Sequence, residues 1–138
     1  MSDSPSRTLR IIVADDHPSI RENLRYLLNA ELGIVVVGAG NDGHDALRLV
    51  HATRPDVLVV DSDMPDLKGL QVAETLRSDG SQIGIVLYTL DGDACIESAA
   101  SGVDACVTKD SPASVLIDAI HRAAQVESTP PIESTTNS

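Results

Sequence analysis

The sequence is poor in aromatic residues, with two Tyr and no Phe or Trp among 138 residues. Because nucleic-acid bases often stack on aromatic side chains, this chain offers few platforms for them. A core must instead be built from Val, Ile, Leu and Ala, and the apolar fraction of 42% is sufficient for one. The length fits one ordinary domain and leaves little room for a second.

Basic residues are also scarce. Ten Lys and Arg stand against twenty-one Asp and Glu, which gives a formal net charge of −11 at pH 7. Such a charge repels the phosphate backbone of DNA or RNA, so we expect this chain itself to bind no nucleic acid. An acidic excess suits solubility, a divalent cation or a basic partner surface.

Cysteines and long apolar runs are few or missing. The two cysteines, Cys95 and Cys106, form no Cys-x-x-Cys pair, and we interpret them as small core residues, with a disulfide as the less favoured alternative. The sequence shows no basic-then-apolar leader and no apolar run near the ~18 residues of a membrane span. We therefore expect a cytoplasmic protein without membrane contact.

Short apolar runs of strand length alternate with helical patterns along the chain. The runs are Leu9–Ala14, Ile34–Val37, Val57–Val60, Ile83–Thr89 and Ala105–Thr108. Five strands alternating with five helices predict an α/β fold, in which a parallel sheet is covered by helices on both faces. The expected strand order is 2-1-3-4-5.

Proline, glycine and capping residues mark the ends of the expected helices. Pro18 suits a first helical turn, Asn41 or Asp42 can cap a second helix, and Gly80 can close a third. A fourth helix is expected around 94–100, and a fifth opens near Ser111 and is followed by a tail rich in Ser, Thr and Pro. We expect residues 1–8 to be disordered, residues 9–126 to form the domain, and residues 127–138 to be a linker or disordered tail.

Polar residues follow four of the expected strands. Asp15 and Asp16 follow the first, Asp61 the third, Thr89 ends the fourth and Lys109 follows the fifth. Functional groups of such sheets lie beyond the carboxyl ends of the strands, where the winding direction reverses. Strands one and three are neighbours in the expected order, so the three carboxylates are predicted to converge.

Converging carboxylates repel one another and need a counter-charge, which Mg²⁺ supplies through oxygen ligands. Asp61 could ligate the metal with one oxygen and attack a phosphorus atom with the other, forming an acyl phosphate. Thr89 and Lys109 could then hold phosphoryl oxygens. Each residue alone also has a structural explanation, such as a helix cap, a strand residue or a surface charge. Their coincidence at one sheet edge favours the phosphoryl-transfer site.

Four segments resemble the receiver domain of two-component response regulators: IIVADDHPSIR, PDVLVVDSDMPDLKGL, IVLYT and GVDACVTKDSP. The resemblance spans residues 9–125 and implies a flavodoxin-like receiver domain over 9–126. It implies a signalling module, not an enzyme, that takes a phosphoryl group from a sensor histidine kinase. A second copy of the chain is a further candidate partner.

The resemblance also implies a role for each site residue. Asp61 would be the phosphoacceptor, Asp16 a direct Mg²⁺ ligand, and Asp15 an acidic partner acting through water. Asp63 would contribute its backbone carbonyl to the metal without needing its side chain. Thr89 and Lys109 match the family's phosphate-sensing hydroxyl and its lysine.

Two short segments, HP at 17–18 and KDSP at 109–112, resemble those of receiver domains joined to a LuxR-type helix-turn-helix. This implies transcriptional output through a DNA-binding domain of a longer parent, and no such helix pair is evident in these 138 residues. Cys106 replaces the Tyr or Phe usual three residues before the lysine, so a ring rotation cannot report activation here. Leu90 replaces a small residue after Thr89.

Three alternatives stay open at the level of sequence. A receiver-like module could bind partners without being phosphorylated; the acidic residues do not support this alternative, but Cys106 and Leu90 leave it open. The spacing of Asp61 and Asp63 also matches haloacid-dehalogenase-type phosphatases, whose first Asp is a nucleophile and second a general acid. Finally, the glycines of residues 38–43 precede a helix, as in a dinucleotide-binding fingerprint.

Overall fold

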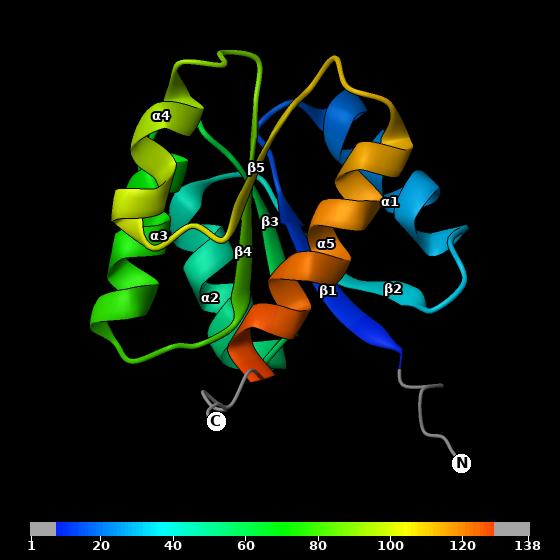
Figure 1. Ribbon diagram of the computed structural model, residues 1–138, viewed down its shortest axis with the longest axis horizontal. Helices are drawn as coiled ribbons and strands as arrows, with labels where there is room; N and C mark the ends of the chain where they lie inside the picture. Colours follow the sequence, from blue (N-terminus) through cyan, green and yellow to red (C-terminus); the bar gives the residue numbers. More distant parts are fainter. Residues whose placement is uncertain (1–7, 129–138) are drawn as a thin grey trace, which may run out of the picture.

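The computed structural model describes residues 8–128 as a central parallel sheet between two layers of helices (Figure 1). The strands are β1 (Leu9–Ala14), β2 (Ile34–Gly40), β3 (Val57–Asp61), β4 (Gly84–Thr89) and β5 (Ala105–Thr108). Their order in the sheet is β2-β1-β3-β4-β5, and every pairing is parallel. The fold class and strand order predicted from the sequence are confirmed.

Strand β2 extends three residues beyond its expected end. Its pairing with β1 shifts register between Ile11 and Ile12, and Gly38 lies against this irregularity. A Cβ at Gly38 would come 2.8 Å from the end of the Ile12 side chain, so any other residue there would force that side chain to shift. The apolar pattern could not show this extension, because backbone pairing and not side-chain burial carries it.

The helices are α1 (Pro18–Asn29), α2 (Gly43–Thr53), α3 (Gly69–Ser78), α4 (Ala94–Ser98) and α5 (Ala113–Ser128), with a 3₁₀ turn at Ala99–Ser101. Pro18 is the first residue of α1, where a missing N–H costs nothing. The Asp42 carboxylate caps α2 by accepting from the Asp45 N–H. Gly80 follows α3 with φ +85°, a conformation that glycine adopts without strain.

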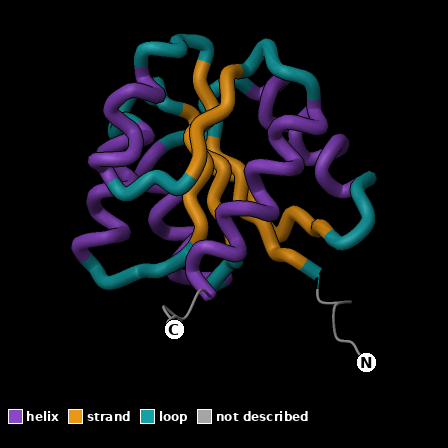
Figure 2. Tube along the Cα trace, viewed as in Figure 1, coloured by secondary structure: helices purple, strands orange, loops and turns teal. Residues whose placement is uncertain are grey.

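Each face of the sheet packs against its own set of helices (Figure 2). On one face, α1 and α5 contribute Leu28 and Ile120 to a core shared with β1, β3, β4 and β5. On the other, α2 and α3 contribute Val50 and Leu76, and Ala94 of α4 packs at its margin. The largest fully buried side chains are all aliphatic, as the lack of aromatic residues required.

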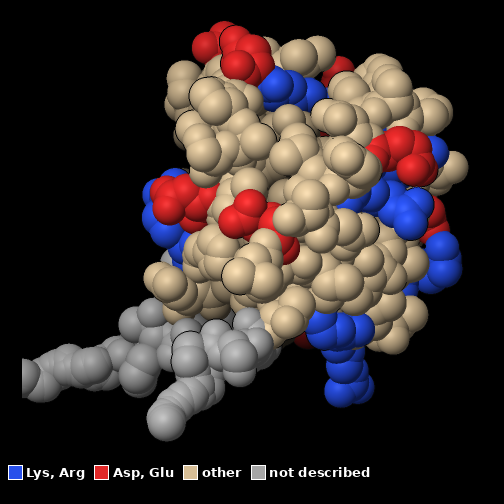
Figure 3. Space-filling view, turned by 90° about the vertical axis from the view of Figure 1, so that its right-hand side faces the viewer, with Lys and Arg blue, Asp and Glu red and all other residues tan. Residues whose placement is uncertain are grey.

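The expected disordered start at 1–8 and the expected linker or tail at 127–138 lie outside the described residues, apart from Thr8 and the end of α5. Helix α5 continues to Ser128, two residues beyond the expected domain boundary. Among residues 8–128, no helix combines the length and apolar character needed to cross a membrane. The face seen in Figure 3 carries acidic and basic side chains in small mixed groups.

The interpretation of the cysteines as unpaired core residues is wrong. Cys95 in α4 and Cys106 in β5 form a disulfide, with Cα atoms 5.5 Å apart. This separation is in the range that disulfides bridge. The pairing could not be predicted from the sequence, because the two residues come together only when α4 packs beside β5, the edge strand of the sheet.

Candidate functional site

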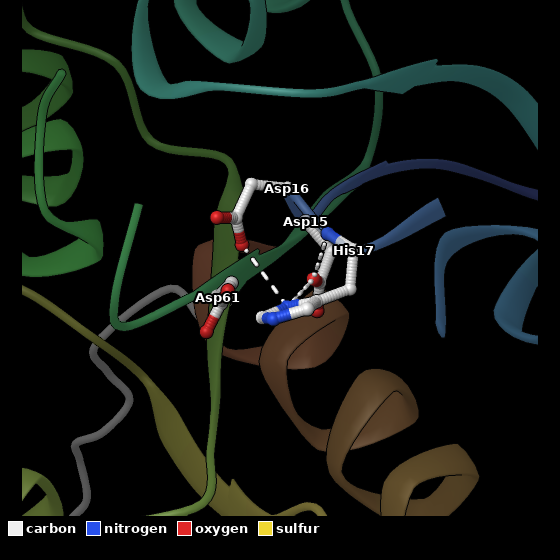
Figure 4. A group of neighbouring side chains, drawn as sticks. All are labelled: Asp15, Asp16, His17 and Asp61. Atoms are coloured by element: carbon white, nitrogen blue, oxygen red, sulfur yellow. Dashed lines mark hydrogen bonds and ion pairs between the residues drawn. The ribbon is translucent and has the colours of Figure 1, made fainter. Parts of the chain in front are cut away.

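The carboxyl ends of β1, β3, β4 and β5 point to the same edge of the sheet, at the top of Figure 1. Asp15 and Asp16 follow β1, and Asp61 is the last residue of the neighbouring β3. One carboxylate oxygen of each and a ring nitrogen of His17 all lie within 4.8 Å of one another (Figure 4). The parallel topology therefore brings together the three acids that the sequence singled out from β1 and β3.

Lys109 supplies a positive charge to this acidic cluster from the end of β5. Its ammonium nitrogen donates a hydrogen bond of 2.8 Å to Asp15 Oδ2 and lies 3.2 Å from Asp61 Oδ1. The side chain is only 6% exposed. Its nitrogen also lies 5.7 Å from the ring centroid of Tyr88, within cation–π range. Lys109 is thus held among charged and aromatic partners, and not extended into solvent.

The electrostatics of the site follow from burial and charge. Burial and the nearby Asp15 carboxylate raise the pKa of Asp61 to about 6, although the Asp63 N–H and Lys109 act in the opposite direction. Burial alone would lower the pKa of Lys109, but the hydrogen bond and charge of Asp15 and the charge of Asp61 outweigh it and raise that pKa. One lysine therefore does not fully compensate the crowded carboxylates.

Two buried carboxylate oxygens at the site lack hydrogen-bond partners: Asp16 Oδ1 and Asp61 Oδ2. His17 Nδ1 lies 3.1 Å from Asp16 Oδ1 but outside hydrogen-bond geometry, and it contacts Asp15 Oδ1 at 3.2 Å. A buried anionic oxygen without a partner is costly. Both oxygens face a cluster of the hard ligands that Mg²⁺ prefers, so the donor set fits that ion.

Asp63 differs from the other acids. Its carboxylate is 84% exposed and lies 3.3 Å from Lys68 Nζ. Its backbone N–H donates to Asp61 Oδ1 at 3.2 Å. The side chain therefore stands outside the acidic cluster, and only the backbone of Asp63 is directed to the site.

Thr89 is fully buried at the end of β4. Its hydroxyl oxygen accepts hydrogen bonds from the Ser62 hydroxyl at 2.7 Å and the Asp91 N–H at 3.0 Å. Ser62 was not predicted as a site residue, although its place directly after Asp61 in the sequence was the available signal. Together, the Ser62–Thr89 and Thr89–Asp91 hydrogen bonds link the loop after β3 to the loop after β4.

A cavity of about 370 Å³ opens beside these groups. Asp61, Thr89 and Lys109 line it together with residues of the β4–α4 loop and α4. Leu90 also lines it, and its side chain is 76% exposed. Leu90 therefore stands at the mouth of the cavity and does not fill it.

The glycine-rich stretch at 38–43 has a structural role. The N–H groups of Gly43 and His44 donate to the Asp66 carboxylate at 2.7 and 2.9 Å, and Asp42 accepts from Asp45. These carboxylates occupy the N-terminus of α2 where a pyrophosphate would bind in a dinucleotide site. The phosphatase alternative is also disfavoured, because the Asp63 carboxylate that should act as general acid points to Lys68.

Comparison with known proteins agrees with this geometry. Residues 11–121 match the response regulator receiver domain family. The chain is 37% identical over 121 residues to YxjL, an uncharacterized transcriptional regulatory protein of Bacillus subtilis (86% of this chain, 56% of YxjL). It is 30% identical over 122 residues to the response regulator VraR of Staphylococcus saprophyticus (87% of this chain, 58% of VraR). The chain thus spans a little over half the length of these curated relatives.

Solved structures show the same fold. The receiver domain of the putative response regulator NarL from Mycobacterium tuberculosis superimposes with a TM-score of 0.81 at 30% identity, covering 86% of this chain and 98% of that one. A LuxR-family response regulator from Aurantimonas sp. SI85-9A1 also gives 0.81 at 30% identity and covers 86% of each chain. The chain therefore belongs to the response regulator receiver domain family, and its relatives include LuxR-family regulators.

Proposed function

We propose that this receiver domain accepts a phosphoryl group on Asp61 from a sensor histidine kinase, with Mg²⁺ as cofactor. The observation that carries the proposal is the environment of the Asp61 carboxylate. One oxygen lies 3.2 Å from the Lys109 ammonium, while the other is buried without a hydrogen bond at the cavity. A carboxylate in this position has a fixed orientation and one oxygen that no protein donor occupies.

In the proposed reaction, the Asp61 carboxylate oxygen that does not ligate Mg²⁺ attacks the phosphorus atom of a phosphohistidine. The new O–P bond forms as the P–N bond breaks, and the histidine ring leaves with the bonding electron pair. Mg²⁺, held by Asp16, Asp61 and the Asp63 carbonyl, with Asp15 acting through water, would neutralise phosphoryl charge. Water later hydrolyses the acyl phosphate and returns the Asp61 carboxylate.

Two residues of the chain would stabilise the transferred group. The Lys109 ammonium, already beside Asp61, offers a charged donor to a phosphoryl oxygen. Thr89 lines the same cavity, and its hydroxyl would donate to a second phosphoryl oxygen by giving up its hydrogen bond to the Asp91 carbonyl. Because Thr89 also bonds the Asp91 backbone, a change at its hydroxyl would reach the β4–α4 loop. This contact would give phosphorylation a route by which it alters the surface of the domain.

The partners follow from this role. The domain would act as a cytoplasmic signalling module, not an enzyme with its own turnover, and would meet a histidine kinase. Since the curated relatives are regulators of nearly twice its matched length, its output would be transcription through a DNA-binding domain of a longer parent. A second copy of the chain would be a partner in that output.

The experiment is intact-mass spectrometry after incubation with acetyl phosphate and MgCl₂. We expect the wild type to gain one phosphoryl group and the Asp61→Asn variant to gain none. Asp63→Asn is the matched control, because it removes an exposed carboxylate of the same loop and keeps the backbone carbonyl. Equal labelling of wild type and Asp61→Asn would refute the proposal.

A further inference from the structure

The Cys95–Cys106 disulfide joins α4 to the edge strand β5. We propose that this pair is a thiol–disulfide exchange site, and that its redox state sets the mobility of the cavity wall beside Asp61. The reductant would be a small thiol or a dithiol protein. The exchange chemistry is independent of phosphorylation, whereas its effect on phosphoryl transfer rests on the proposed function.

Helix α4 has few other attachments to the sheet. It contains five residues, and its N-cap, Asp93, makes no side-chain capping bond. Ile96 is 80% exposed, and the hydroxyl of the buried Ser98 bonds only within the helix, to the Cys95 carbonyl. Ala94 is the residue of α4 whose small side chain packs at the margin of the core. The disulfide is therefore the strongest link between α4 and β5.

The same segment forms one wall of the cavity. Leu90, Asp91 and Asp93 of the β4–α4 loop line it, as does Ala94, the neighbour of Cys95. Asp91 also holds the Thr89 hydroxyl through two backbone hydrogen bonds. A change in the attachment of α4 thus acts on the loop that positions Thr89.

The disulfide is open to exchange because both cysteines are only half-buried. A reductant thiolate attacks one sulfur, the protein S–S bond breaks, and a mixed disulfide forms. A second reductant thiolate then releases the remaining cysteine. Two electrons pass to the protein, two protons complete its thiols, and the reductant leaves as a disulfide. Oxidation reverses these steps by exchange with a disulfide oxidant.

The proposed cytoplasmic location bears on the role of the Cys95–Cys106 pair. Disulfides in the cytosol of most organisms are transient and serve catalysis or redox sensing. Reduction would free α4 and the β4–α4 loop, since a cross-link limits the open states of the segment it closes. We therefore expect a reduced domain with a more mobile cavity wall and easier access to Asp61.

The first test is amide hydrogen exchange of the full chain, in its oxidised form and after dithiothreitol. We expect exchange in residues 90–100 to become about tenfold faster or more on reduction, because local opening no longer works against a cross-link. Peptides from β1 and β3 should not change. The matched control, Cys95→Ser with Cys106→Ser, should exchange at the fast rate with or without reductant. Equal exchange in oxidised and reduced wild type would overturn the proposal.

A second measurement separates this inference from the proposed function. Labelling by acetyl phosphate and MgCl₂ should become severalfold faster on reduction in the wild type and stay unchanged by reductant in the double serine variant. Equal labelling rates in both thiol states would overturn the regulatory inference while leaving phosphorylation in place. Absence of labelling in both states would overturn the proposed function and the regulation that rests on it. Hydrogen exchange would still decide whether the disulfide sets the mobility of the wall.

Discussion

The Lys109 ammonium nitrogen lies 3.2 Å from an Asp61 carboxylate oxygen, although 48 positions separate the two residues in the chain. Both side chains are almost entirely buried, at 6% and 3% exposure. The same nitrogen reaches Asp15 at 2.8 Å. A single buried cation thus joins the ends of three strands, and the behaviour of the acidic cluster depends on it.

We expect Lys109→Met to lower the free energy of unfolding by about 3–5 kcal/mol at neutral pH without metal, because it leaves two buried carboxylates without their cation. Thermal and urea unfolding measure the change. Lys68→Met is the matched control, since its ion pair with Asp63 is exposed and worth about 1 kcal/mol or less. Adding Asp61→Asn to Lys109→Met should restore part of the loss. An equal effect of the two lysine variants would contradict this role.

Asp61 should destabilise the metal-free protein at neutral pH. Its pKa is raised from 3.8 to about 6, so the folded state binds the proton more tightly than the unfolded chain does. Stability then falls as pH rises through about 4–6, by up to about 3 kcal/mol. We expect Asp61→Asn to raise Tm at pH 7 in EDTA and to lose this advantage below about pH 4. A Tm increase in Asp61→Asn that is independent of pH would refute the electrostatic explanation.

Mg²⁺ should stabilise the folded chain, because its proposed ligands form an acidic cluster only after folding. At a hundred times its Kd, the gain is about 2.7 kcal/mol. We expect MgCl₂ to raise Tm of the wild type and of Asp63→Asn, and to have little effect on Asp16→Asn or Asp61→Asn. NaCl at equal ionic strength controls for screening. A rise that survives in Asp16→Asn would place the ion elsewhere.

Asp66 should stabilise α2 from a distant loop. Partial burial would raise its pKa, but hydrogen bonds from the N–H groups of His44, Gly43 and Leu67 outweigh this and hold it well below 3.8. Its contribution is therefore present above about pH 4 and lost as pH falls through the native pKa. We expect Asp66→Ala to cost about 1–2 kcal/mol at pH 7 in urea unfolding. A cost that persists unchanged in strong acid would contradict the capping role.

The sequence predicted the sheet and the meeting of the acids for one physical reason. In a parallel sheet the carboxyl ends of all strands lie at the same edge, so residues that directly follow the strands gather there. Asp16, Asp61 and Lys109 follow or end apolar runs whose limits are clear from composition alone. Their convergence needed only the strand order, and the structure shows that order.

Features that depend on contacts between separate segments could not be predicted in this way. The Cys95–Cys106 bond depends on how α4 packs beside β5. Asp66 caps α2 from the loop before α3, and Arg77 binds the Asp104 carboxylate at 2.9 Å beside the Gly102 and Ile83 carbonyls. Local patterns contain no signal for such pairings, because they describe one element at a time.

Chemical trapping can locate the phosphoryl group that we propose for Asp61. Borohydride reduces an acyl phosphate on aspartate to the alcohol, homoserine, and peptide mass spectrometry then finds the altered position. After acetyl phosphate and MgCl₂, we predict homoserine at position 61, with Asp15, Asp16 and Asp63 intact. Homoserine at another of these acids, or none in a protein that has gained phosphate, would show that Asp61 is not the phosphoacceptor.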